Sequence, residues 1–119
     1  MSSASNSVIL LANDLMLSST VSGFAAQSGR KFFSAGSNSD VTAAVSEDPA
    51  ALLFVDLGTP GLDVAGLAES IPADVLQRAV AYGPHVHTQK LDAARNAGFG
   101  SVMSRGQFSA QVGTLISDS

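Results

Sequence analysis

The architecture follows from one segment, Leu52-Leu53-Phe54-Val55-Asp56-Leu57-Gly58-Thr59-Pro60-Gly61-Leu62-Asp63, in which an apolar run stops at a carboxylate and turn residues follow at once. A continuous apolar run is typical of a strand covered on both faces, as in a parallel sheet between two layers of helices. Pro60 and Gly61 then predict a turn. Ligands of open α/β sheets bind beyond the carboxyl ends of the strands, so we expect Asp56 at such a crevice.

Similar apolar runs alternate with segments of helical periodicity along the rest of the chain. We expect strands at residues 8–12, 31–35, 52–56, 75–82 and 101–104. We expect helices at residues 15–27, 40–45, 63–70, 88–97 and 107–116. This alternation predicts the α/β class, as a single doubly wound, flavodoxin-like (βα)5 domain with a parallel five-stranded sheet of order 2-1-3-4-5.

Length and composition fit one packed domain. The chain has 119 residues, 45% of them hydrophobic and 13% charged, which favours a compact core over disorder. We therefore assign residues 1–119 to one domain and expect flexible tails at 1–7 and 117–119.

Charge and cysteine usage exclude several classes of function. The net charge is -4 and the sequence has no basic cluster, so we expect no nucleic-acid partner. The absence of cysteine excludes disulfides and thiolate chemistry, and is compatible with a cytoplasmic location. The apolar run at residues 8–12 is far shorter than a membrane span, so we expect no membrane partner.

Polar residues follow the first strand as well as the third. In the predicted strand order the first and third strands are neighbours, so Asn13 and Asp14 are expected to meet Asp56 at a topological switch point. Two structural roles remain open for Asp56, namely capping the helix that follows it or pairing with Arg105.

Two segments resemble the receiver domain of two-component response regulators, and the resemblance extends over essentially the whole chain. Residues 56–63 resemble the family segment in which a phosphate-accepting aspartate precedes a Met-Pro-Gly turn, with Thr59 in the methionine position. Residues 97–106 resemble the closing segment, with Arg105 and Gly106 in place of Lys-Pro. The resemblance implies that Asp56 is the phosphoacceptor, with Arg105, Gly83 and Thr59 placed to contact the phosphate.

The chain departs from the receiver pattern at the positions that hold magnesium. Receivers end the first strand on two acids, whereas this chain has Ala12 and Asn13 there. A Mg²⁺ site built from Asp56, Asn13 and the main-chain carbonyl of Gly58, with Asp14 as a substitute ligand, is therefore expected to be weak.

Other departures affect the phosphate contacts. Gly83 lacks the hydroxyl that normally follows the fourth strand, and Arg105 replaces a compact ammonium by a planar guanidinium. Val102 stands where receivers carry an aromatic switch residue. These differences place the chain among atypical receivers or pseudo-receivers.

Two histidines lie in the loop after the fourth strand. An extended His85-Val86-His87 segment is expected to place both imidazoles on one side, where they form either a metal-binding or a pH-sensitive loop beside Asp56. The other interpretation is a solvated loop in which the histidines cap the next helix.

Our leading interpretation is a stand-alone signalling module, not an enzyme, that acts through protein–protein contacts. Phosphorylation of Asp56 by a histidine kinase is one form of this hypothesis, and a constitutive module bound to a downstream effector is the other. The resemblance implies a homodimer surface on the fourth helix, fifth strand and fifth helix. The alternative is a flavodoxin-like domain that binds a small molecule or metal in the Asp56 crevice with His85 and His87.

Two apolar residues have simpler interpretations. We expect Met16 to pack in the first helix, and Phe33 to occupy a core or edge position on the second strand.

Overall fold

The computed structural model describes residues 7–118, which form a five-stranded, all-parallel sheet of order β2-β1-β3-β4-β5. The strands are Val8–Leu11 (β1), Phe32–Ala35 (β2), Leu52–Asp56 (β3), Val80–Gly83 (β4) and Ser101–Ser104 (β5). The predicted fold class and strand order are confirmed.

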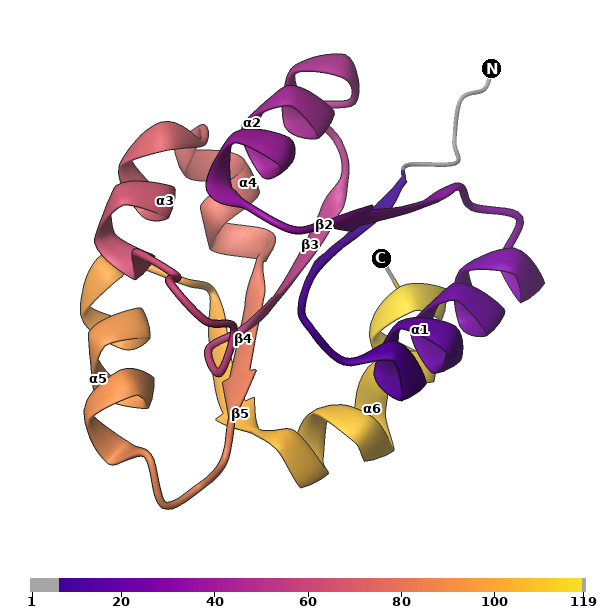
Figure 1. Cartoon of the computed structure of the whole chain (residues 1–119). Coiled ribbons are helices and arrows are strands. Elements are labelled where there is room, and N and C mark those ends of the chain that lie inside the picture. Colours follow the sequence, from indigo (N-terminus) through magenta and orange to yellow (C-terminus); the bar gives the residue numbers. More distant parts are fainter. Residues whose placement is uncertain (1–6, 119) are drawn as a thin grey trace.

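Helices cover both faces of the sheet (Figure 1). One layer consists of Leu15–Gln27 (α1) and Arg105–Ser117 (α6). The other consists of Asn38–Glu47 (α2), Val64–Ser70 (α3), Ala73–Arg78 (α4) and Thr88–Ala97 (α5). Ser117, which falls in the expected C-terminal tail, is the last residue of α6. Residues 1–6 and 119 of the expected tails lie outside the described residues.

The strand expected at residues 75–82 is wrong in its first half, because residues 73–78 form α4. Pro72 stands at the N-cap, and Asp74 in the first turn pairs with Arg78 in the last turn at 3.6 Å. Val75 is fully buried. The strand starts only after Ala79 leaves the helix in an extended conformation. The described residues therefore form six helices, one more than expected.

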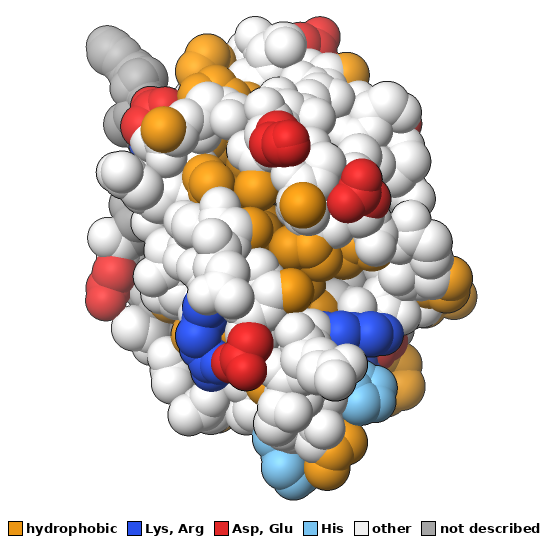
Figure 2. Space-filling model, turned by 90° about the vertical axis from the view of Figure 1, so that its left-hand side faces the viewer, with side chains coloured by type: hydrophobic (Ala, Val, Ile, Leu, Met, Phe, Trp, Pro, Cys, Tyr) orange, Lys and Arg blue, Asp and Glu red, His pale blue; other side chains and the backbone are white. Residues whose placement is uncertain are grey.

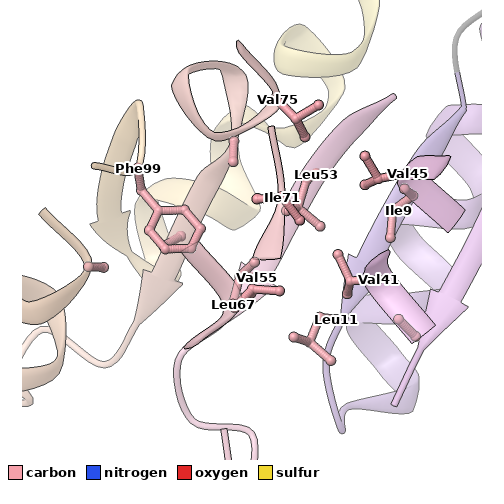
Figure 3. Close-up of a cluster of buried hydrophobic side chains, with 14 of the residues drawn as sticks. Ile9, Leu11, Val41, Val45, Leu53, Val55, Leu67, Ile71, Val75 and Phe99 are labelled. Atoms are coloured by element: carbon pink, nitrogen blue, oxygen red, sulfur yellow. The ribbon is translucent and has the colours of Figure 1, made fainter. Parts of the chain in front are cut away.

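The hydrophobic core is divided by the sheet, as the continuous apolar runs predict. Alternate residues of β3 point to opposite faces, so Leu53 and Val55 pack beneath α2 to α5 while Leu52 and Phe54 pack beneath α1 and α6. Figure 3 shows the first of these clusters, with Leu53 and Val55 beside side chains from the covering helices. Burial on both faces fixes β3, and with it the position of Asp56.

The strand register brings three loops together at the carboxyl edge of the sheet. Leu11 pairs with Val55, so Ala12 follows at the level of Asp56, and Asp56 itself pairs with Tyr82 of β4.

Over residues 7–118 no helix has both the length and the hydropathy needed to cross a membrane.

Candidate functional site

Asp56 is the only charged side chain that is buried among the described residues, with 7% of its surface exposed. Its Oδ1 accepts a hydrogen bond from the Gly58 N–H at 2.8 Å. The Thr59 hydroxyl donates to the main-chain carbonyl of Asp56 at 2.7 Å. Thr59 therefore stabilises the turn after β3 in this structure, whereas the sequence predicted a phosphate contact for it.

A depression of about 540 Å³ lies beside Asp56. Its lining is contributed by the loops that follow β1, β3 and β4 and by the start of α6: Asn13, Asp14, Leu15, Met16, Asp56, Gly58, Pro60, Pro84 and Arg105. The structure thus brings together five of the predicted site residues, which are Asn13, Asp14, Asp56, Gly58 and Arg105. Thr59, Gly83, His85 and His87 are not among the residues that line this depression.

Asp14 and Arg105 form an ion pair in the lining of the depression. Oδ1 of Asp14 also caps α1, because it accepts hydrogen bonds from the N–H groups of Met16 and Leu17 at 3.0 and 3.1 Å. Both oxygens of this carboxylate are therefore engaged. Neither structural role left open for Asp56 is observed: Arg105 pairs with Asp14, and α3 is capped by Asp63.

The histidine loop is a turn, so the expectation of an extended His-Val-His segment is wrong. The His87 N–H donates to the Pro84 carbonyl at 2.9 Å, which closes the turn. His87 occupies the N-cap position of α5 without a side-chain capping bond. Figure 2 shows both histidines on the surface at the end of the molecule where this loop lies. Across residues 7–118 no three His, Cys, Asp or Glu side chains are grouped to hold a metal.

Tyr82 lies directly beside Asp56 in the sheet and was not singled out as a site residue from the sequence. Its fully buried ring stacks on Phe108 of α6, with centroids 4.1 Å apart and planes 5° from parallel. The Tyr82 hydroxyl has no hydrogen-bond partner among the described residues. Burial, with a further contribution from the negative charge of Asp56, raises the pKa of Tyr82 well above its ordinary value.

Two large apolar side chains line the depression on its outer side. Leu15 and Met16, at the start of α1, are 89% and 83% exposed. We call these two residues the apolar rim. Val86 in the histidine turn is also exposed, but it is not among the residues that line this depression. The expectation that Met16 packs in the protein is wrong, because it lies outside the stripe that α1 buries, which consists of Leu17, Val21 and Ala25.

Comparison with known proteins gives structural matches only. No protein-family model and no curated protein matches the chain. The crystal structure of the receiver domain of NtrX from Brucella abortus matches with a TM-score of 0.71 and 16% identity, over 94% of this chain and 99% of that domain. The solution structure of the beryllofluoride-activated NtrC4 receiver domain dimer matches with a TM-score of 0.69 and 12% identity, over 93% and 96%.

The chain has the fold of a response-regulator receiver domain. A longer NtrX structure also matches, with a TM-score of 0.73 and 16% identity over 96% of this chain, but the match spans only 28% of that protein. At these identities the likeness establishes the fold.

The resemblance to receiver domains implies a Mg²⁺ site at this edge, but the side chains present here fit a magnesium ion poorly. Ala12, at the level of Asp56, offers no side-chain ligand. Asp14 is occupied by two N–H groups and by Arg105, so a cation has to displace the guanidinium to reach it. The remaining oxygen donors are Asp56, the Asn13 amide and main-chain carbonyls, which is fewer carboxylates than a hard divalent cation prefers.

The missing hydroxyl at Gly83 is not a steric requirement of this fold. A Cβ atom built on Gly83 meets its nearest neighbour, the Leu57 Cβ, at 3.4 Å, which is ordinary van der Waals contact. The backbone therefore has room for a Cβ atom at this position, and the glycine removes a donor without relieving a clash at Cβ.

Proposed function

We propose that this chain is an atypical receiver module that signals through protein–protein contacts without phosphorylation of Asp56. The observation that supports this most directly is the ion pair between Asp14 and Arg105 in the lining of the Asp56 depression. In this arrangement the one cation among the lining residues is already neutralised by a carboxylate.

Electrostatics explain why the arrangement disfavours phosphoryl transfer. An incoming phosphoryl group brings negative charge beside the Asp56 carboxylate, and transfer needs cations and donors directed at that charge. Here Arg105 is paired with Asp14, so the two together supply no net positive charge, and Gly83 has no hydroxyl. The site is therefore less able to stabilise the transition state than a site with a free cation and a bound metal.

The apolar rim supports a binding role for the same edge of the sheet. Leu15 and Met16 expose apolar surface beside a charged depression, and an apolar patch beside polar groups is typical of a protein docking site. We propose that a downstream effector protein docks over this rim, that the module is not itself an enzyme, and that it works in the cytoplasm.

Partner capture from cells with matched variants tests this function. Asp56→Asn preserves the shape of the side chain and removes its phosphorylation, so it is expected to retain the same partner as the wild type. Leu15→Ser and Met16→Ser each remove apolar surface from the rim, and each variant is expected to lose binding to that partner. Loss of the partner in Asp56→Asn, with retention in the rim variants, contradicts the proposal.

A further inference from the structure

The fourth exposed large apolar residue, Phe33, lies away from the rim on the edge strand β2. Phe33 is 44% exposed, and β2 has a strand neighbour on only one side. The Phe33 side chain contributes to a cavity of about 500 Å³ beside α2, together with Lys31, Ala44 and Glu47. An unpaired edge with an exposed aromatic residue is a template for pairing with another strand.

The hydrogen bonding of β2 shows which of its main-chain groups are free. The Val8 N–H donates to the Lys31 carbonyl at 2.8 Å, so Lys31 and Phe33 direct their main-chain groups toward β1. Since alternate residues of a strand face opposite edges, the main-chain groups of Phe32 and Ser34 face outward. These are the groups available to a new strand.

We propose that β2 pairs antiparallel with β2 of a second copy of this chain, which joins the two sheets across a two-fold axis at Phe33. In this register Phe32 of one copy exchanges both main-chain hydrogen bonds with Ser34 of the other. The two Phe33 residues then form a non-hydrogen-bonded pair, the arrangement in which facing side chains are closest. Each Phe33 ring covers the exposed part of the other.

Charge complementarity favours a second copy as the occupant of this edge. Lys31 is exposed and makes no ion pair with any described residue, and Asp40 is held at the opposite end of β2 by the Gly36 N–H at 3.1 Å. The two-fold register places Lys31 opposite Ala35 of the second copy, next to its Gly36 and Asp40. Two symmetric Lys31–Asp40 pairs therefore flank the aromatic contact.

The pairing involves a strand of only four residues, so we expect a weak dimer rather than an obligate one. Pairing through β2 is independent of the function of the Asp56 depression, because β2 is an outer strand of the sheet and β1 separates it from β3, which carries Asp56.

Sedimentation velocity of the whole chain, from about 10 μM to about 1 mM, tests the pairing. We expect a monomer–dimer equilibrium whose dissociation constant rises about tenfold in Phe33→Ser, in Lys31→Glu and in Asp40→Lys. The double variant Lys31→Glu/Asp40→Lys restores opposite charges across the axis, so its dissociation constant is expected to return to within about threefold of the wild type.

Val86→Ser is the matched control, since it removes an exposed apolar side chain elsewhere and is expected to leave the dissociation constant unchanged. A chain that stays monomeric over the whole range overturns the proposal. The proposal is also overturned if Phe33→Ser leaves the dissociation constant unchanged. It is overturned as well if the double variant Lys31→Glu/Asp40→Lys does not bring the dissociation constant back toward that of the wild type.

Discussion

Asp14 pairs with Arg105 while the same carboxylate caps the first turn of α1. One side chain therefore joins the loop after β1 to the start of α6, with Asp56 lining the same depression. The Arg105 side chain is about half exposed, whereas the Asp14 side chain is largely buried. Its two roles are separable, because capping needs only an acceptor and the ion pair needs the charge.

Variants of this pair are expected to show the two roles separately. Asp14→Ala loses both the cap and the ion pair and is expected to lower the free energy of unfolding by about 1–2 kcal/mol. Asp14→Asn keeps a capping oxygen, so it and Arg105→Ala are each expected to cost less than about 1 kcal/mol. Urea unfolding measures all three changes. Equal losses in Asp14→Ala and Asp14→Asn contradict the capping role.

Tyr82 is expected to remain neutral well above the ordinary tyrosine pKa of 10.0. It is the only tyrosine of the chain, so ultraviolet absorbance during an alkaline titration reports on this residue alone. The raised folded pKa means that stability is unaffected below about pH 10 and is lost as the pH rises further, because only the unfolded chain ionises readily. Tyrosinate absorbance is therefore expected to appear together with unfolding.

A titration near pH 10 with the fold intact contradicts the burial of this hydroxyl. Tyr82→Phe is the matched variant: it removes a buried hydroxyl that has no partner while keeping the ring on Phe108, so stability is expected to hold or to rise by about 1 kcal/mol.

The apolar rim is expected to contribute to binding and not to folding. Leu15→Ser and Met16→Ser remove exposed side chains, so each is expected to change the free energy of unfolding by less than about 0.5 kcal/mol. Leu17 follows directly in the same helix but is only 5% exposed, so Leu17→Ala is expected to cost about 2–5 kcal/mol. A large destabilisation by either serine variant means that the rim is part of the core.

The sheet was predictable because β3 is apolar on both faces and ends at a turn, a pattern that fits few positions other than the centre of a parallel sheet. The error at residues 75–82 arose because only Ala79 separates α4 from β4, so apolar residues of the helix were taken as part of the strand. Pro72 at the N-cap and the Asp74–Arg78 spacing are the features of the sequence that indicate a helix.

The site was predictable in part. Strand ends converge by topology alone, so Asn13, Asp14 and Asp56 were expected together. The partner of Arg105 was not predictable, because two carboxylates lie within the same depression and local geometry decides between them. The exposure of Met16 was predictable from helical periodicity, because the stripe that α1 buries consists of Leu17, Val21 and Ala25 and Met16 lies outside it.

Intact-mass spectrometry after incubation with acetyl phosphate and Mg²⁺ shows whether Asp56 accepts a phosphoryl group. Three proteins are compared: the wild type, Asp56→Asn, and a variant with Ala12→Asp, Gly83→Ser and Arg105→Lys, which supplies the missing acid, hydroxyl and compact cation. We predict no phosphoryl adduct on the wild type or on Asp56→Asn, and an adduct on the restored variant. A phosphoryl adduct on the wild type that is absent from Asp56→Asn contradicts this prediction.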